Sequence, residues 1–565
     1  MIEDLRVLII GGYGSFGGRI VELLRDEPSL TLVVSGRSLD RASACCTRTA
    51  GAATLVPAAF DRDGDLADQL ARLKPDLLID ASGPFQGYGS GRYRVIEACL
   101  ALQINYLDLA DSSDFVAGIG TLDEAARRHG CFALSGASSF PALTAAVVRR
   151  LSADMVRVDG IIGGVAPSPY AIVGENVVRA IAGYAGQAVP VHRDGKTAMS
   201  YPFTEYRRFT IAPPGCLPLC SRLFSLVDVP DLRQLAMLCP EAQSVWIGAA
   251  PAPAILHRIL AAMAWLVRWR IVPTLSPLAP AMHLAMRHLR WGERRGGMFV
   301  RVEGADASGL ASARSWHLIA EGETGPYIPA MAAAALVRKT LQGVPPGPGA
   351  RAATRELELE DYAPLFAERS IKTGCRQHSA DDASPLYADI LGAAFDRLPS
   401  AIRAMHAGTS IASGRASVER GNGLLSRLVA ACVGFPPATE DTPVSVRFDA
   451  GKGAELWTRT FGAKVFSSRQ FAGRGRSERL LCEGFGPLTF TMALVADGAR
   501  LSLVLRGWRA FGIPMPLFLA PRSNAHETVE DGRFRFHVEI RHPLTGLIVR
   551  YRGWLVPAES GTKPG

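Results

Sequence analysis

The sequence predicts an α/β fold: a doubly wound parallel sheet with an inserted α+β domain, then a separate C-terminal domain of mainly antiparallel strands. Three observations predict it. An apolar run at the N-terminus leads through a glycine-rich turn into a helical pattern, as expected for a buried parallel strand and its crossover helix. Apolar runs and helical patterns then alternate up to about residue 150. Beyond residue 380, short strands separated by glycine or proline dominate.

Size and composition fit several globular domains. The chain has 565 residues, of which 48% are hydrophobic and 20% are charged, which excludes wholesale disorder. At roughly 100–200 residues per domain, we expect about three domains. The net charge is +9, yet no Lys/Arg-rich run is present, so we predict no nucleic-acid partner. The ten cysteines match no disulfide framework or metal-ligand spacing, and we predict no metal site.

The glycine-rich turn predicts a dinucleotide site. The apolar run at residues 5–10 is followed by Gly12, Gly14 and Gly17, which form the pattern G-x-G-x-x-G. The first glycine permits a tight turn, the second lets the backbone approach a pyrophosphate, and the third lets the helix pack closely. Because the motif lies between a strand and a helix, we predict a Rossmann-type domain rather than a structural turn. Backbone N–H groups at the helix start would come from Ser15 and Phe16.

The end of the second predicted strand indicates which dinucleotide binds. The apolar residues 30–34 lead into Gly36, Arg37 and Ser38. A site for NAD places an acidic residue here for the ribose 2′-hydroxyl, whereas an arginine and a hydroxyl suit a 2′-phosphate. We therefore predict NADP as the cofactor. The alternative is that Arg37 is a solvated loop residue and that the site does not select.

A neighbouring strand end completes the predicted cofactor site. The apolar strand at residues 77–80 runs into Ser82, Gly83 and Pro84. Doubly wound folds bind their ligands at the carboxyl ends of the strands. We therefore predict that these three residues line the nicotinamide side.

Two aspartates are candidates for a catalytic proton donor. Asp108 and Asp111 lie at the end of the strand predicted at residues 105–109. A desolvated aspartate at this edge could act as a general acid. Carboxylates at strand ends also cap helices or bind ribose hydroxyls, so the structural alternative stays open. The Tyr-x-x-x-Lys pair of short-chain dehydrogenases is absent, since the first 195 residues contain a single lysine, Lys74.

Several segments together resemble the saccharopine dehydrogenase (saccharopine reductase-like) family, in a bacterial branch of uncertain substrate. The resemblance covers roughly residues 1–345 and is carried by residues 11–17, 36–38, 80–85, 106–111 and 135–139, with later similar segments at 227–232 and 325–329. It implies an NADP-binding domain interrupted by an α+β domain that covers the nicotinamide and binds substrate. It also implies that the chain returns to the first domain.

These observations predict the domain boundaries. We expect a Rossmann domain at 1–150, a substrate or dimerisation domain at 151–345 whose last helix returns to the Rossmann domain, and a linker at 346–380. A C-terminal domain follows at 381–557, with a tail at 558–565. The C-terminal domain is similar to a bacterial domain of unknown function, a resemblance carried by residues 391–392, 398–399, 406, 457–461, 486–487, 514–516 and 550–554. Its aromatic residues could enclose an apolar ligand or form a plain core: Phe448, Phe490, Trp508, Phe534, Phe536 and Trp554.

Residues 251–289 are unusually apolar, but prolines interrupt every run before it reaches the roughly 20 residues of a membrane span. Two interpretations remain open: a buried helical pair, or a segment at 255–290 that lies at a membrane interface. The N-terminus shows no secretory signal, so we expect a cytoplasmic protein, with peripheral membrane contact under the second interpretation. The segment at 151–345 is also where a homodimer would form.

The functional prediction follows from the cofactor. We predict an NADP(H)-dependent oxidoreductase that transfers hydride to or from a C=O, C=N or C=C bond of a small or lipid-like substrate. The alternative is a non-catalytic NADP-binding sensor or partner-binding protein. Neither the substrate nor the direction of the reaction follows from the residues.

Overall fold

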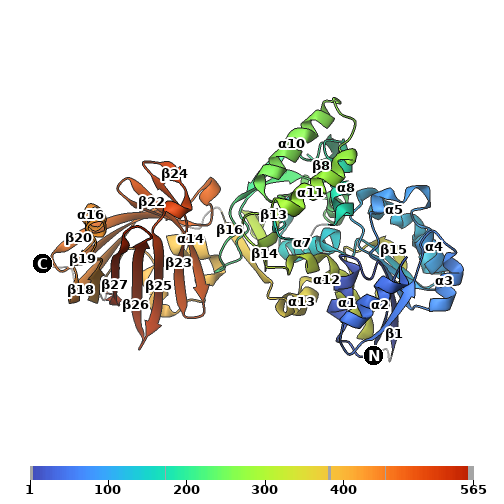
Figure 1. The fold of residues 1–565 in the computed structure, drawn as a ribbon, viewed down its shortest axis with the longest axis horizontal. Coiled ribbons are helices and arrows are strands. Elements are labelled where there is room, and N and C mark those ends of the chain that lie inside the picture. Colours follow the sequence, from blue (N-terminus) through green and yellow to red (C-terminus); the bar gives the residue numbers. More distant parts are fainter. Residues whose placement is uncertain (1–3, 172–173, 380–383, 452, 558–565) are drawn as a thin grey trace. The chain divides into compact units, whose positions relative to one another are not determined.

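The computed structural model describes residues 4–171, 174–379, 384–451 and 453–557, and the predicted tail at 558–565 lies outside these residues. The chain forms two units (Figure 1). Unit 1 consists of residues 1–207 and 223–373, and unit 2 of residues 208–222 and 374–565. The chain therefore contributes one short early segment to the unit that otherwise holds its C-terminal third.

Unit 1 is built on a parallel sheet of seven strands, which confirms the predicted α/β class. Most of its strands are nearly continuous apolar runs, because helices cover both faces of such a sheet. Strand order reverses between β1 and β4, which is where doubly wound folds bind ligands. In sheet order the strands are β15 (Gly349–Ala352), β6 (Phe132–Ser135), β5 (Asn105–Asp108), β4 (Leu77–Asp80), β1 (Leu5–Ile10), β2 (Leu30–Gly36) and β3 (Thr54–Ala59).

The helices of this sheet begin where the sequence offers capping side chains. Ser38, Asp65 and Ser112 each accept a hydrogen bond from a backbone amide in the first turn of the helix that follows. The helices are α1 (Gly17–Leu24), α2 (Leu39–Arg48), α3 (Leu66–Leu73), α4 (Arg94–Ala101), α5 (Ser113–Gly118), α6 (Asp123–Arg128) and α7 (Thr144–Ser152).

The predicted linker at 346–380 needs correction. Its residues 349–352 form β15, which pairs in parallel with β6 at the edge of the sheet. The next segment forms α13 (Ala363–Glu368), and Glu358 just before it forms an ion pair with Arg149 of α7. The sequence did not indicate β15 because Gly-Ala-Arg-Ala has no apolar run, and its pairing rests on backbone hydrogen bonds. The last residue of the predicted linker, 380, lies outside the described residues.

A second sheet makes up the inserted domain of unit 1. Its central strands are β11 (Arg222–Leu226), β12 (Ser244–Ala249), β7 (Arg157–Ala166), β13 (Arg295–Ala305) and β14 (Ala311–Glu321), in this order. The pairing is antiparallel except between β12 and β7. The chain passes between the two units near β10 (Tyr206–Phe209), β11 and β16 (Lys372–Ser379). A two-stranded ribbon adds β8 (Val189–Arg193) and β9 (Lys196–Ser200), and the helices are α8 (Glu175–Tyr184), α9 (Asp231–Leu238), α10 (Ala254–Arg268), α11 (Ala279–His288) and α12 (Ile328–Leu341).

Helix α12 joins the inserted domain to the first sheet. It is buried on almost every side, since its small residues, including Ala332 and Ala335, allow close packing. Its Arg338 donates to the carboxylate of Glu27 and to the carbonyl oxygen of Leu23, and Tyr327 donates to Glu22. The chain thus returns to α1 of the Rossmann sheet.

The apolar stretch around 251–289 forms two helices that are only partly buried. Helix α10 buries one face, which includes Leu260, Ala264 and Val267. The large side chains of Trp269 and Ile271, which follow it, are 62% and 65% exposed. None of the helices in the described part of the chain is long and apolar enough to cross a membrane.

Unit 2 contains an antiparallel sheet that closes on itself, because β22 pairs with β23 as well as with β21 (Figure 1). Side chains alternate between the interior and the outside along each strand. The strands are β17 (Ser410–Arg420), β18 (Thr439–Gly451), β19 (Ala454–Phe461), β20 (Lys464–Ala472), β21 (Leu481–Phe485), β22 (Leu488–Asp497), β23 (Arg500–Ala510), β24 (Ile513–Met515), β25 (Arg522–Glu530), β26 (Arg533–His542) and β27 (Gly546–Pro557), with helices α14 (Leu386–Leu391), α15 (Ser400–Met405) and α16 (Leu424–Val433).

Candidate functional site

The glycine-rich loop connects β1 to α1 in a geometry that only glycine allows. Gly11 has a φ of +74°, which favours glycine. A Cβ atom on Gly17 would lie 2.2 Å from the carbonyl oxygen of Gly11, and one on Gly14 would lie 2.9 Å from the same atom. The loop therefore folds back on itself so tightly that α1 begins against it.

The loop presents backbone amides at the start of α1. The amides of Gly12 and Gly14 donate within the protein, to Ser35 and Gly11. Within the described part of the chain, no acceptor is found for the amides of Ser15 and Phe16. Two free N–H groups at the N-terminus of a helix suit the pyrophosphate of a dinucleotide, so this cradle fits the predicted cofactor.

A basic cluster lies at the end of β2. Arg37 is exposed directly after the strand, and Ser38 caps α2. The hydroxyl of Tyr13, from the glycine loop, accepts from the amide of Ser38 at 3.1 Å, and the guanidinium of Arg41 lies 4.6 Å from the Tyr13 ring centre. Two arginines and a hydroxyl at this position can hold a 2′-phosphate.

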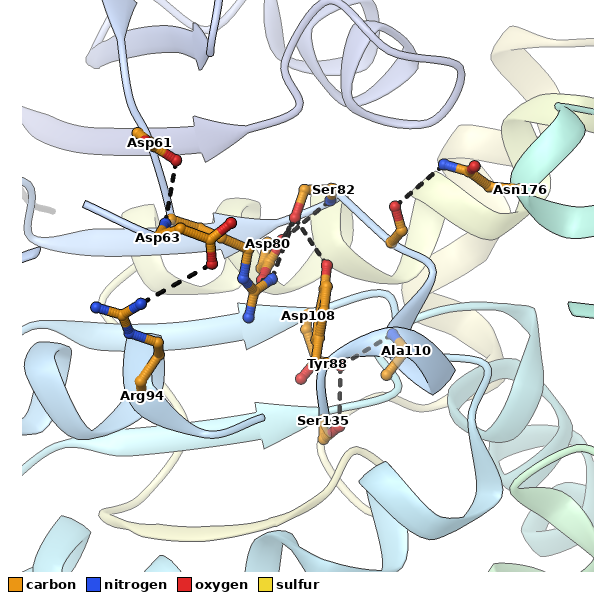
Figure 2. Close-up of polar contacts among 12 residues, drawn as sticks. Asp61, Asp63, Asp80, Ser82, Tyr88, Arg94, Asp108, Ala110, Ser135 and Asn176 are labelled. Atoms are coloured by element: carbon orange, nitrogen blue, oxygen red, sulfur yellow. Dashed lines mark hydrogen bonds and ion pairs between the residues drawn. The ribbon is translucent and has the colours of Figure 1, made fainter. Parts of the chain in front are cut away.

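At the end of β4, a buried carboxylate organises the loop that carries Ser82, Gly83 and Pro84 (Figure 2). Asp80 is fully buried and accepts from the amide of Ser82 at 2.9 Å and from its hydroxyl at 2.5 Å. Arg62, from the loop after β3, forms an ion pair with Asp80 at 2.8 Å. The guanidinium of Arg62 also lies 3.5 Å from the ring centre of Tyr88, whose hydroxyl is 3.0 Å from that of Ser82.

Asp108 lies at the end of the neighbouring strand, β5, and is fully buried (Figure 2). Its Oδ1 accepts from the hydroxyl of Ser135 and from the amides of Ala110 and Gly136, at 2.8–2.9 Å. Its Oδ2 has no partner among the described residues. Burial raises the pKa of Asp108 to about 7, although the three hydrogen bonds oppose the rise.

Asp111 is half-buried at the same edge and accepts from the side-chain amide of Gln86 at 3.1 Å. Burial raises its pKa, and repulsion from Asp228 of the inserted domain adds to the rise. Burial also raises the pKa of Asp228, whose carboxylate accepts from Ser113 at 2.6 Å. The pKa of Tyr184, at the end of α8, is raised well above its ordinary value by burial and by the charges of both aspartates.

The inserted domain covers this edge of the sheet. Asn176, in the first turn of α8, donates to the carbonyl oxygen of Gly83 at 3.2 Å (Figure 2). A Cβ atom on Gly174 would lie 3.8 Å from the hydroxyl oxygen of Ser15. The start of α8 therefore lies over the glycine loop and over the loop after β4, both of which carry predicted cofactor residues.

The sequence assigns the predicted cofactor residues to one edge of the sheet, but it does not distinguish the environments of the two candidate aspartates. The structure buries Asp108 among loop backbone groups and leaves Asp111 partly accessible. Sequence reasoning missed Arg62, Tyr88, Asp228 and Tyr184. The segment that contains Asp228 contributed to the family resemblance, which was the available signal. No group of three or more His, Cys, Asp or Glu side chains able to hold a metal ion is found in the described ranges.

Matches among the solved structures include several dehydrogenases. Saccharopine dehydrogenase (L-Glu forming) from Saccharomyces cerevisiae is 13% identical, with 66% of this chain and 100% of that chain covered and a TM-score of 0.48. The WlbA (WbpB) dehydrogenase from Thermus thermophilus is 13% identical, with coverage of 63% and 94% and a TM-score of 0.29. A probable dehydrogenase from Thermotoga maritima is 9% identical, with coverage of 63% and 92% and a TM-score of 0.31.

Family models match both ends of the chain. Residues 7–133 match the family described as the saccharopine dehydrogenase NADP binding domain. Residues 398–555 match the family described as domain of unknown function DUF4166. A search of curated proteins finds no match to the sequence. The resemblance is thereby confirmed for these two stretches: residues 7–133 match the saccharopine dehydrogenase NADP-binding domain family, and residues 398–555 match DUF4166.

Proposed function

We propose that the protein is an NADP(H)-dependent oxidoreductase that transfers hydride to or from a C=O, C=N or C=C bond of a small or lipid-like substrate. The observation that carries the proposal is the covered sheet edge of unit 1. There the glycine loop and the loop after β4 lie under the start of α8, and the basic cluster follows β2 at the same edge of the sheet. The match to an NADP-binding family supports the choice of cofactor.

Each part of this edge has a distinct role toward the cofactor. The amides of Ser15 and Phe16 bind the pyrophosphate, and the glycines let it approach. Arg37, with Ser38 and Arg41 beside it, binds the 2′-phosphate. The loop of Ser82, Gly83 and Pro84, which Asp80 holds in place, lines the nicotinamide side. The bound cofactor supplies or accepts the hydride.

We assign proton transfer to the half-buried groups at this edge of the sheet. Asp111 has a raised pKa and is partly accessible, so we assign it the delivery of a proton to the substrate. Repulsion from Asp228 adds to the rise in the pKa of Asp111 and so favours its protonated form. The buried Tyr184 lies in the same region, where the charges of both aspartates raise its own pKa. Asp108 is too deeply buried to reach a substrate, and we assign it the positioning of the loops that carry Ala110 and Gly136.

A second candidate is a non-catalytic NADP sensor. It requires the same cofactor residues but no accessible proton donor. The position of Asp111 beside Asp228 favours the enzyme.

We also propose that the α10–α11 region contacts an anionic membrane. Residues 251–292 contain five arginines and no acidic residue. Large apolar side chains are exposed in this region, including Ile259, Trp269, Ile271 and Leu284. Exposed apolar groups among arginines suit the boundary between headgroups and acyl chains. The competing occupant of this surface is a second copy of the chain, in a homodimer.

Replacing Arg37 tests the cofactor. In Arg37→Ala, we expect NADPH to bind about 10–100-fold more weakly and NADH to be little affected, because only NADPH loses a charge-assisted phosphate contact. Quenching of tryptophan fluorescence measures both affinities. Arg48→Ala, at the other end of α2, is the matched control and should bind NADPH like the wild type. Equal losses for both nucleotides, or no loss, would contradict the assignment.

Replacing Asp111 separates the enzyme from the sensor. We expect Asp111→Asn to bind NADPH normally but to turn over roughly 10²–10⁴ times more slowly, because a general acid is removed. NADPH oxidation with a panel of aldehydes, 2-oxo acids with amines, and enoyl compounds measures turnover. Asp114→Asn, three residues away and exposed, is the control. Unchanged turnover in Asp111→Asn sinks the proton-donor role, and NADPH binding without turnover of any compound favours the sensor.

The raised pKa of Asp108 predicts a pH-dependent stability. The carboxyl binds its proton more tightly in the folded state, at about 7, than in the unfolded state, at about 3.9, so stability falls as pH rises between these values. Asp108→Asn keeps the oxygen acceptor and does not titrate. Between pH 5 and pH 8, the wild type should therefore lose about 2–3 kcal/mol relative to this variant. Urea unfolding at both pH values measures the difference, and an equal difference at both would refute the prediction.

Flotation with vesicles tests the membrane contact. We expect the wild type to float with anionic vesicles at low salt and to lose this binding at high salt, because the arginines are screened. The double variant Trp269→Glu, Ile271→Glu should not float. A control with Met199→Glu and Met237→Glu, which are also exposed in unit 1, should float like the wild type. Absence of flotation at low salt rules out the contact, and gel filtration then tests the homodimer.

A further inference from the structure

The closed sheet of unit 2 surrounds an interior cavity of about 360 Å³. Its wall is mostly apolar and comes from most strands of the sheet. The apolar lining includes Val446, Leu503, Leu505, Val538 and Ile540. A cavity of this size lies at the lower end of the range for small-molecule sites, which are typically about 300–1,000 Å³ and largely apolar.

Most of the aromatic residues singled out from the sequence line this cavity. Phe448, Phe490, Trp508, Phe534 and Phe536 all lie on its wall. Trp554 does not, and the guanidinium of Arg533 lies 5.0 Å from its ring centre. The aromatic residues therefore form a wall around empty space, whereas a plain core would have filled it.

One charged group on the wall is satisfied by its own neighbours. Arg459 forms an ion pair with Glu483 at 3.0 Å. The same carboxylate accepts from the hydroxyl of Ser468 at 2.6 Å and from the amide of Gln470 at 3.2 Å. This cluster closes on itself and leaves no buried hydrogen-bonding group for a ligand.

His406 is different, since one of its ring nitrogens is buried without a partner. The residue is 1% exposed and lies on the cavity wall. Its Nε2 lies 2.7 Å from Glu527, and its ring stacks on Tyr387 at 3.7 Å. Its Nδ1 has no hydrogen-bond partner among the described residues. His526 and Thr545 also carry an unpaired atom, but both residues are only half-buried.

The contact with Glu527 determines what His406 offers. In the neutral tautomer that donates a hydrogen bond from Nε2 to the Glu527 carboxylate, Nδ1 is an acceptor. A buried acceptor without a donor costs free energy. A ligand that brings one O–H group to the wall would remove this cost.

We propose that unit 2 binds one apolar molecule that ends in a single O–H group, with the aliphatic part in the cavity and the O–H donating to Nδ1 of His406. At about 30 Å³ for each water-sized group, the cavity holds on the order of twelve non-hydrogen atoms. An aliphatic alcohol of about ten carbons meets this limit. This binding site lies in unit 2 and does not depend on the oxidoreductase proposal for unit 1.

A ligand series tests the proposal on the full-length protein without changing its fold. The probes are 1-decanol and its methyl ether, and calorimetry measures their affinity and stoichiometry. We expect one decanol per chain and roughly tenfold weaker binding of the ether, which cannot donate a hydrogen bond. Failure of both probes to saturate overturns the site, and equal affinity of the two overturns the role of His406.

Two neighbouring residues of β25 give a matched pair of variants. Ala525 lies on the cavity wall, and Asn524 is exposed on the opposite face of the strand. Ala525→Phe fills the cavity and should abolish decanol binding, whereas Asn524→Phe should leave it unchanged. Decanol binding that survives Ala525→Phe places the ligand elsewhere and overturns the proposal. NADPH affinity, measured on the same samples, shows that unit 1 is intact and keeps this test separate from that of the cofactor.

A double variant tests the head-group contact. His406→Phe with Glu527→Leu replaces both partners by apolar groups and leaves no buried charge. The variant should bind decanol and the ether equally, at the affinity that the wild type shows for the ether. A retained preference for the alcohol assigns the donor contact to another group and overturns this part of the proposal. Circular dichroism of each variant confirms that the sheet has formed.

Discussion

Two buried aspartates at the ends of adjacent strands hold the site of unit 1 together. Asp80 and Asp108 are directly opposite in the register of β4 and β5. Arg62 forms an ion pair with Oδ2 of Asp80, and the hydroxyl of Ser82 donates a hydrogen bond to Oδ1. Asp108 has no ion-pair partner among the described residues, and it accepts three hydrogen bonds from Ala110, Ser135 and Gly136, at the ends of β5 and β6. A buried carboxylate must be paired or protonated, so both strand ends are obliged to keep their loops in one arrangement.

This constraint explains why so much of unit 1 follows from local sequence. The strands of the parallel sheet are apolar runs that need both faces covered, and the glycines of the first turn leave room only for backbone. Each of these features involves only a few neighbouring residues, so it can be recognised from the sequence without knowledge of the tertiary structure. β15 is the exception in the sheet, because its sequence Gly-Ala-Arg-Ala contains no apolar run and its pairing with β6 rests on backbone hydrogen bonds. The strands of unit 2 can also be predicted from their sequence patterns. The closure of the sheet cannot, because it depends on the pairing of β22 with β23, which includes a register shift.

The candidate site was only partly predictable for the same reason. Residues that follow a predicted strand, such as Ser82 and Asp111, could be assigned to the sheet edge by position. Asp228 and Tyr184 reach that edge from the inserted domain, and no local pattern indicates where such a domain packs. Arg62 follows β3, a strand whose partial burial makes its end hard to locate. Contacts between groups far apart in sequence decide which carboxylate is accessible, and these contacts give Asp108 and Asp111 different roles.

In unit 2, two features of the interior lower the stability of the fold: an empty cavity and a buried nitrogen without a hydrogen-bond partner. A sheet that needed only stability would place an apolar side chain at position 406 and fill the interior, because an empty cavity and an unpaired buried nitrogen both cost free energy. Instead, Glu527, Tyr387 and Trp457 hold His406 rigidly on the wall of an open space. Anything that binds the folded state alone stabilises it in proportion to its affinity and concentration. The cost of the cavity is therefore smaller when a ligand is bound, which is the condition under which such an interior makes physical sense.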